Sequence, residues 1–193
     1  ENIPQDKILV TGNTVIDALL ESKKLAGQPE REKLFSSQLP KLDSDKKLIL
    51  VTGHRRESFG EPLKRVCQAI RDVVAARDDV EVLWALHPNP NVAPVVRAEL
   101  EGCERVHLRP AMPYSEFVAV MGEADVVLSD SGGVQEEATV LGKPLLVLRE
   151  ATERPEALAA TGRLVGTDPA TILAEVSRVL DGEGSRPQSP SPF

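Results

Sequence analysis

The fold is decided by residues 125–141, which read DVVLSDSGGVQEEATVL. Residues 125–129 form a short apolar run rich in β-branched side chains, and such a run predicts a buried strand. Residues 133–141 follow as a predicted helix, and Gly132 and Gly133 mark the turn between the two. A strand that passes through a glycine turn directly into a helix is typical of parallel α/β sheets.

The same alternation continues in both directions along the chain. Further strands are predicted over residues 47–52, 80–86, 106–108, 144–148 and 163–165. Further helices are predicted over residues 61–76, 91–100, 115–121, 153–160 and 169–180. Alternation of this length implies right-handed crossovers and a parallel sheet with helices on both faces. The expected fold class is therefore α/β, with one doubly wound, Rossmann-like parallel sheet over roughly residues 8–181.

The two ends of the chain differ from this middle part. Residues 7–10 predict a strand and residues 14–25 a helix, and the polar residues 27–46 predict a connection. Residues 182–193 are rich in glycine, serine and proline, so we expect a disordered tail there.

These patterns divide the chain into three parts. They are 1–46 (strand, helix and connection), 47–181 (the α/β domain) and 182–193 (the tail). Because the chain starts at Glu1 without an initiator methionine, we expect it to be a piece of a longer protein.

Composition and charge exclude several functions. The chain has 193 residues, of which 41% are hydrophobic and 27% charged, as in an ordinary globular domain. Lys and Arg total 23 and Asp and Glu total 30, and the net charge of −7 lacks the electrostatic footprint of a general nucleic-acid binder. The longest apolar runs, of about six to eight residues, are far shorter than a membrane span. We therefore expect neither nucleic acid nor a membrane as a partner.

Cysteine and histidine patterns support neither a metal site nor a disulfide framework. Cys67 and Cys103 have no Cys or His at metal-ligand spacing, so we interpret both as reduced thiols packed like small hydrophobic side chains. This usage favours a reducing, cytoplasmic compartment. The three histidines, His54, His87 and His107, are scattered, and the chain lacks the GxxxxGK(S/T) and GxGxxG motifs.

Polar loops follow four of the predicted strands. They are residues 53–60 (GHRRESFG), 87–90 (HPNP), 130–137 (DSGGVQEE) and 149–156 (REATERPE). In open parallel sheets ligands bind beyond the carboxyl ends of the strands. Because all four loops are expected at that edge, we interpret them together as a ligand site.

The loop at residues 131–133 is suited to a phosphate. Gly132 and Gly133 let backbone amides approach a ligand closely, and a helix N-terminus offers free N–H groups with a positive dipole end. Ser131 either caps the helix or donates to a phosphate oxygen. One turn on, the Glu137 carboxylate can accept hydrogen bonds from both hydroxyls of a ribose, whereas Glu136 is expected to be a solvated charge.

Positively charged side chains are expected around the same pocket. His54 follows a buried strand and precedes Arg55 and Arg56, a set that could neutralise a diphosphate or protonate a leaving group. The alternative for His54 is a capping or packing role. Arg154 stands at a helix start, where a cation is unfavourable, so it is expected either to bind an anion or to pair with a neighbouring glutamate, Glu153 or Glu156.

Four motifs give a resemblance to a known family. They are VTGHRRESFGEPL at residues 51–63, HPNPNV at 87–92, SDSGGVQEEA at 129–138 and TERPE at 152–156. In this order they closely resemble the signatures of the non-hydrolysing UDP-N-acetylglucosamine 2-epimerases. Residues 8–17 (ILVTGNTVID) resemble the family's interdomain hinge, so that the likeness extends over about residues 1–181.

The resemblance implies a fold, a reaction and a set of partners. The chain would be the C-terminal half, the nucleotide-binding domain, of a GT-B-type two-domain enzyme that interconverts UDP-GlcNAc and UDP-ManNAc. The C2 proton is removed and UDP is eliminated to give a 2-acetamidoglucal, to which UDP adds back after reprotonation on the other face. Neither metal nor other cofactor is needed. The acids for proton transfer lie on the N-terminal domain, so this chain alone is expected to be inactive.

The resemblance also assigns roles to residues of this chain. Ser131, Gly132 and Gly133 would hold the diphosphate, Glu137 would bind the ribose, and Arg154 would contact the nucleotide.

Other residues fall around the base and the reacting bond. Phe117 would lie near the uracil, as would Met112, where the family often has a polar Gln. His54 would act beside the diphosphate and help UDP to leave. Arg56 and His87 would belong to the family's second, allosteric UDP-GlcNAc site.

Beyond the ligand, the resemblance implies that the full-length enzyme is a homodimer. It also implies that the enzyme acts in the cytoplasm, in the biosynthesis of cell-surface polysaccharides.

Two alternative functions stay open. The chain could be the donor-nucleotide domain of a GT-B glycosyltransferase, or a stand-alone nucleotide sensor without catalysis. The His-Arg-Arg-Glu loop at residues 54–57 favours the epimerase.

Overall fold

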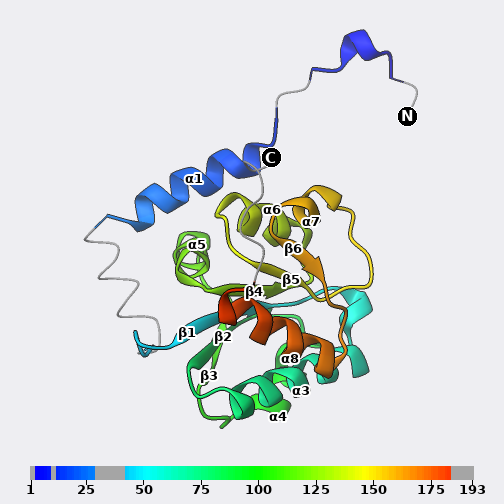
Figure 1. Ribbon diagram of the computed structural model, residues 1–193. Coiled ribbons are helices and arrows are strands. Elements are labelled where there is room, and N and C mark those ends of the chain that lie inside the picture. Colours follow the sequence, from blue (N-terminus) through cyan, green and yellow to red (C-terminus); the bar gives the residue numbers. More distant parts are fainter. Residues whose placement is uncertain (1–2, 10–11, 29–41, 184–193) are drawn as a thin grey trace.

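The computed structural model describes residues 3–9, 12–28 and 42–183. Its centre is one six-stranded parallel sheet in the order β3-β2-β1-β4-β5-β6 (Figure 1). The strands are β1 (Lys47–Thr52), β2 (Val80–Leu86), β3 (Val106–Pro110), β4 (Val126–Ser129), β5 (Leu145–Val147) and β6 (Gly162–Leu164). The strand order reverses between β1 and β4, which is where open α/β sheets bind ligands.

The central strands are buried on both faces. In β1, Ile49 and Val51 join the core on one side of the sheet, and Leu48 and Leu50 join the core on the other. This double burial explains why the strand is almost uniformly apolar rather than alternating. The register pairs Leu50 with Val127 of β4, which fixes the ends of β1 and β4 side by side.

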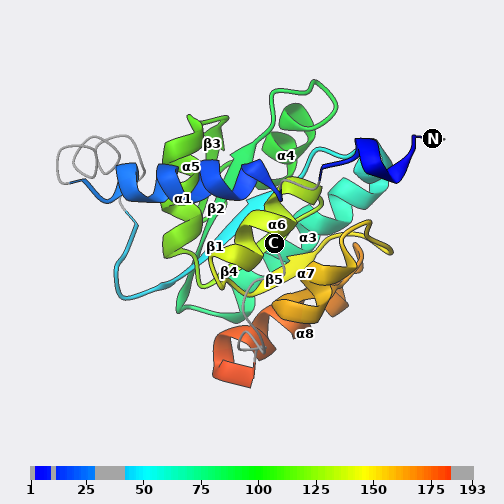
Figure 2. The same cartoon turned by 90° about the horizontal axis from the view of Figure 1, so that it is seen from above.

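Helices cover both faces of the sheet. Their bounds are α1 (Thr14–Ala26), α3 (Glu61–Ala76), α4 (Ala93–Leu100), α5 (Tyr114–Glu123), α6 (Gly132–Val140), α7 (Pro155–Ala160) and α8 (Pro169–Arg178). Helices α3, α4 and α8 lie on one face, and α5, α6 and α7 lie on the other (Figure 1). Helix α1 crosses outside α5 and α6, as the view from above shows (Figure 2).

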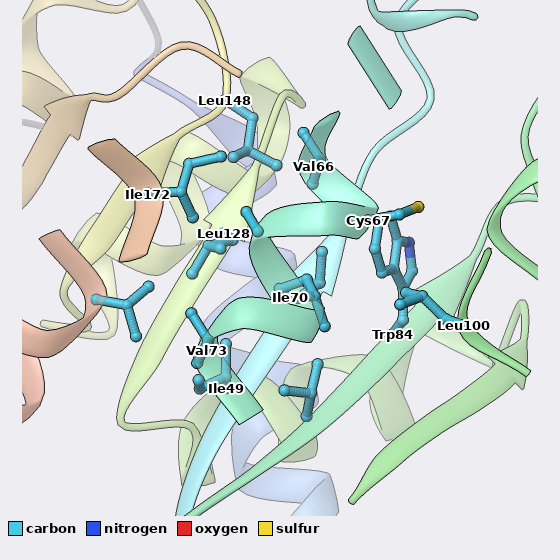
Figure 3. Close-up of a cluster of buried hydrophobic side chains, with 14 of the residues drawn as sticks. Ile49, Val66, Cys67, Ile70, Val73, Trp84, Leu100, Leu128, Leu148 and Ile172 are labelled. Carbon is cyan, nitrogen blue, oxygen red and sulfur yellow. The ribbon is translucent and has the colours of Figure 1, made fainter. Parts of the chain in front are cut away.

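The larger core lies under α3 and α8. Trp84 and Ile70 are fully buried there, with Leu100 of α4 beside Trp84 (Figure 3). The apolar residues of α3 recur at helical spacing, so one stripe of the helix faces the sheet. Within the described ranges, none of the helices combines the length and apolar character that crossing a membrane requires.

The expected fold class is confirmed, and so are the predicted strands and helices of the α/β domain, with ends that shift by one or two residues. The helix predicted at 14–25 is confirmed as α1. The strand predicted over residues 7–10 is wrong for the part that the structure describes. Lys7 ends a short 3-10 helix, and Ile8 and Leu9 are 54% and 85% exposed, so no neighbouring strand pairs with them or covers them. Val10, most of the 27–46 connection and most of the predicted tail lie outside the described residues.

Truncation of a buried leucine should be far more damaging than the same truncation on the surface. Leu100 is fully buried, so Leu100→Ala should lower the free energy of unfolding by about 2–5 kcal/mol. Leu9→Ala removes the same atoms from an exposed side chain and should change it by less than about 0.5 kcal/mol. Urea unfolding followed by circular dichroism measures both. Equal losses of stability in the two variants would contradict the burial of Leu100 and the exposure of Leu9.

Candidate functional site

The loops after β1 and β4 are tied together by one buried carboxylate, that of Asp130, which is 1% exposed. It accepts hydrogen bonds from the backbone N–H groups of His54 (3.0 Å) and Arg55 (3.0 Å). The Ser58 hydroxyl donates to it at 2.9 Å. A Cβ at Gly53 would stand 3.3 Å from the same carboxylate, a tight contact that glycine avoids. Asp130 therefore fixes the His-Arg-Arg loop at the carboxyl edge of the sheet.

His54 and His87 are in contact. Their rings stack with centroids 4.9 Å apart and planes 17° from parallel. His54 Nδ1 lies 3.8 Å from the Asp130 carboxylate, and the backbone N–H of Asn89 donates to His87 Nδ1 at 3.2 Å, which fixes the orientation of that ring. The predicted catalytic histidine thus lies against one of the two residues predicted for a second ligand site.

The N-terminus of α6 is open on its Gly133 side. Ser131 is the N-cap residue, but its side chain makes no capping hydrogen bond, and its backbone N–H donates to Ser129 Oγ at 3.0 Å. Among the described residues outside its own helix turn, no atom lies within 4 Å of where a Cβ of Gly133 would stand. At Gly132 a Cβ would meet Glu153 Oε1 at 3.1 Å. A ligand could therefore approach the helix end closely at Gly133, whereas at Gly132 the Glu153 carboxylate already occupies the space.

A chain of ion pairs lies beside this helix end. Glu153 Oε1 accepts from Arg55 Nη2 at 2.6 Å, and Glu153 Oε2 accepts from Arg149 Nη1 at 2.5 Å. Arg149 also donates to Glu57 at 2.6 Å. The bond from Arg149, a backbone hydrogen bond and the bond from Arg55 lower the pKa of Glu153 to about 2, so it is a carboxylate at any physiological pH. Sequence reasoning placed Arg55 in the site but missed this carboxylate bridge.

Arg154 is held by a partner that the sequence did not indicate. Its Nε pairs with the carboxylate of Glu136, and its backbone N–H donates to Thr152 Oγ1 at 3.0 Å. Glu136 is 8% exposed and also accepts from Asn13 Nδ2 at 2.9 Å. The expectation that Glu136 is a solvated charge is wrong, because α1 and the loop before α7 cover this side of α6.

Glu137 is buried next to this pair, 7% exposed, and accepts a hydrogen bond from the Tyr114 hydroxyl at 2.8 Å. Burial raises the pKa of the Glu137 carboxyl, and the hydrogen bond from Tyr114 partly offsets that rise. Tyr114 was not singled out from the sequence.

A small pocket of about 130 Å³ lies beyond the ends of β1 and β2. Met112 and Phe117, both expected near the base, line it together with Thr52, Leu86 and His87. Arg56 is exposed on the short 3-10 turn Arg56–Ser58 and makes no ion pair within the described part of the chain. Over the same ranges, no three His, Cys, Asp or Glu side chains are arranged to hold a metal ion.

The structure thus gathers His54, Ser131, Gly133 and Arg154 at one edge of the sheet, at the reversal of strand order. A family model described as UDP-N-acetylglucosamine 2-epimerase matches residues 1–193. The chain belongs to this family.

Members of the epimerase family share the sequence and the fold over almost the whole chain. The UDP-N-acetylglucosamine 2-epimerase of Salmonella typhimurium is 50% identical over 95% of this chain and 49% of its own length. The crystal structure of the Neisseria meningitidis UDP-GlcNAc 2-epimerase bound to UDP-GlcNAc has a TM-score of 0.89 and 41% identity, over 94% of this chain and 49% of that one. A co-structure of S. aureus MnaA with UDP has a TM-score of 0.77 and 32% identity, over 92% and 47% of the two chains.

This chain therefore spans about half the length of the epimerases that it matches. The resemblance seen in its motifs is confirmed, as is the doubly wound sheet as part of a GT-B-type fold.

Loss of the Asp130 charge should loosen the loop after β1. In Asp130→Asn an amide NH₂ must face N–H or O–H donors, so we expect a loss of about 1–3 kcal/mol in the free energy of unfolding. Ser58→Ala removes one of the three donors and should cost less, about 0.5–1.5 kcal/mol. Urea unfolding measures both variants. An Asp130→Asn variant as stable as the unmodified chain would remove Asp130 from this role.

Proposed function

We propose that this chain is the UDP-binding half of an enzyme that interconverts UDP-GlcNAc and UDP-ManNAc. Its membership of the epimerase family supports this, as does the half-length match to epimerases. The acids for proton transfer at C2 would come from the other half of the protein, so this chain is expected to bind the nucleotide without turning it over.

One observation carries the proposal. The N-terminus of α6 has a free Ser131 side chain and an open Gly133 face, and Asp130 fixes His54 and Arg55 beside it. Backbone N–H groups and the positive end of the helix suit a diphosphate, and a diphosphate bound there would have the imidazole of His54 nearby to assist its departure.

The remaining ligand contacts follow from this placement. Glu137 lies further along the same helix, for the ribose, and Arg154, on the loop before α7, is paired with the adjacent Glu136. The pocket lined by Met112 and Phe117 would take the uracil ring. Each part of UDP thus has a candidate partner on one edge of the sheet.

The chemistry divides between the two halves of the enzyme. The other half would remove the C2 proton, and the electron pair would form the C1–C2 double bond as the C1–O bond to UDP breaks. His54 would donate a hydrogen bond or proton to the departing diphosphate oxygen, and the reverse steps would return UDP to the opposite epimer. Neither His54 nor the diphosphate site needs a metal for this role. Arg56 and His87 would contact a second UDP-GlcNAc beside the first.

We further propose that the longer protein is a cytoplasmic homodimer that serves cell-surface polysaccharide biosynthesis. Two free cysteines, Cys67 and Cys103, support a reducing compartment.

A glycosyltransferase with the same fold is the competing function. Assay of the longer protein for UDP-ManNAc, with and without a sugar acceptor, separates the two.

Ser131 should matter for the ligand and not for the helix. Because its side chain makes no capping bond, Ser131→Ala should leave the free energy of unfolding unchanged. It should weaken UDP binding to this chain by about 2- to 10-fold, as expected for one lost hydrogen bond. Calorimetry with UDP and urea unfolding measure the two effects.

Asp168 provides the matched control for capping. It caps α8 through Thr171 N–H at 2.9 Å, away from the site, so Asp168→Ala should lower stability by about 1 kcal/mol and leave UDP affinity unchanged. If the folded, unmodified chain fails to bind UDP at millimolar concentration, the proposed function is wrong.

His54→Ala in the longer enzyme should lower turnover by about 10²–10⁴-fold, the usual contribution of a general acid. UDP affinity should fall much less, because the helix N-terminus is untouched. His107→Gln changes a histidine on β3, whose Nε2 lies 3.5 Å from Glu81 Oε2, and serves as the control. Steady-state kinetics measure all three enzymes, and near-normal turnover in His54→Ala would exclude His54 from the mechanism.

A further inference from the structure

Glu137 has an unusual set of neighbours for a residue that is expected to bind a ribose. It is 7% exposed on α6, and its Oε1 accepts a hydrogen bond from Tyr114 at the start of α5, 23 positions away in sequence. Among the residues that the structure describes, no Lys, Arg or His pairs with Glu137, whereas the adjacent Glu136 is paired with Arg154. The Tyr114 hydroxyl is therefore what stabilises the Glu137 charge.

The surroundings of the Glu137 carboxyl shift its pKa in opposite directions. Burial and the nearby Glu136 carboxylate both raise the pKa of Glu137, and only the Tyr114 hydroxyl lowers it. The phenol keeps its proton over a wide pH range, because burial and Glu137 raise the pKa of Tyr114. Tyr114 can thus donate to Glu137 at neutral pH.

We propose that Tyr114 is a positioning residue that makes this site select ribose over 2-deoxyribose. Its hydroxyl holds Glu137 as an ionised acceptor in one orientation, with Oε1 bonded to Tyr114 and Oε2 free to accept from the 2′-hydroxyl of a ribose. This inference rests on the proposed UDP site and adds a residue to it.

Selectivity follows from the charge of the acceptor. Burial of an ionised carboxylate has a desolvation cost, which the 2′-hydroxyl of a ribose helps to offset and which 2-deoxyribose, with only its 3′-hydroxyl, offsets less. A protonated Glu137 could donate to other groups and would tolerate the missing hydroxyl. Loss of the Tyr114 hydroxyl therefore weakens discrimination between the sugars.

The Tyr114 ring itself contributes little to the core. The residue is 41% exposed, and its hydroxyl is the group that reaches Glu137. Tyr114→Phe removes that one oxygen and keeps the ring, so the helix and its packing stay as they are. Ser115→Ala removes a hydroxyl from the same turn without touching Glu137 and is the matched control.

The first test compares UDP with 2′-deoxy-UDP by calorimetry on this chain. The ratio of the two dissociation constants cancels the diphosphate, His54 and Arg154, which contact both ligands alike. We expect UDP to bind more tightly to the unmodified chain and to Ser115→Ala. In Tyr114→Phe the ratio should fall by about tenfold, the usual worth of a hydrogen bond to a charged group.

The pH dependence of the same ratio has a defined sign. Because the pKa of Glu137 is raised, preference for ribose should be present at high pH and lost as the pH falls through a value above the usual range for glutamate. Removal of the Tyr114 hydroxyl removes the effect that lowers this pKa, so in Tyr114→Phe the loss should occur at higher pH.

A second test needs no ligand. Tyr114 is the single tyrosine of the chain, so its ionisation is read directly from ultraviolet absorbance, with circular dichroism reporting the fold. The phenol should ionise above its ordinary pKa of about 10. Glu137→Gln keeps an acceptor but removes the charge, and it should bring the phenol pKa back toward that value.

The outcomes separate the two proposals. An unmodified chain that binds UDP, with the same sugar preference in Tyr114→Phe, would overturn the role of Tyr114 and leave the proposed function standing. A Tyr114 phenol pKa that is unchanged by Glu137→Gln would also overturn the role of Tyr114. A folded chain that binds neither nucleotide would overturn the proposed function, and with it the selection of a sugar.

Discussion

The arrangement of the whole carboxyl edge depends on the buried Asp130 carboxylate. It follows β4 directly and draws the backbone of His54 and Arg55 toward the neighbouring strand end. Since the carboxylate is almost wholly desolvated, its hydrogen bonds are what make its burial tolerable. Gly53 leaves room for the carboxylate beside the end of β1, and His54, held there by its backbone, stacks on His87.

The fold could be predicted from the sequence because its signals are local. The apolar run at residues 47–52 predicts a strand buried on both sides. The apolar stripe at residues 61–76 predicts a helix with one face on the sheet. The edge that carries the site also follows from local signals, since every polar loop comes directly after a strand. Local signals also explain the wrong strand prediction at residues 7–9. An apolar run forms a strand only where a neighbouring strand pairs with it, and the sequence of the run does not say whether one does.

The contacts within the site could not be predicted, because they join residues far apart in the chain. Glu136 is a surface charge by its position in the helix, and only the approach of Asn13 and Arg154 makes it a buried ion-pair partner. Tyr114 reaches Glu137 from another helix, and nothing in the spacing of the two residues indicates the bond. Motif spacing therefore predicted which loops meet at the carboxyl edge of the sheet, but not the groups that hold their side chains in position.

The carboxylate of Glu153 at the first turn of α6 has a thermodynamic consequence. This helix end, together with Arg55 and Arg149, already has an anion of the protein's own beside it. A phosphate that approaches on the Gly132 side meets arginines that are already neutralised, so its arrival is an exchange of one anion for another. The affinity that such an exchange yields is the difference between two similar attractions. At the proposed UDP site, such an exchange would favour release of the nucleotide, even though arginines lie beside the helix end.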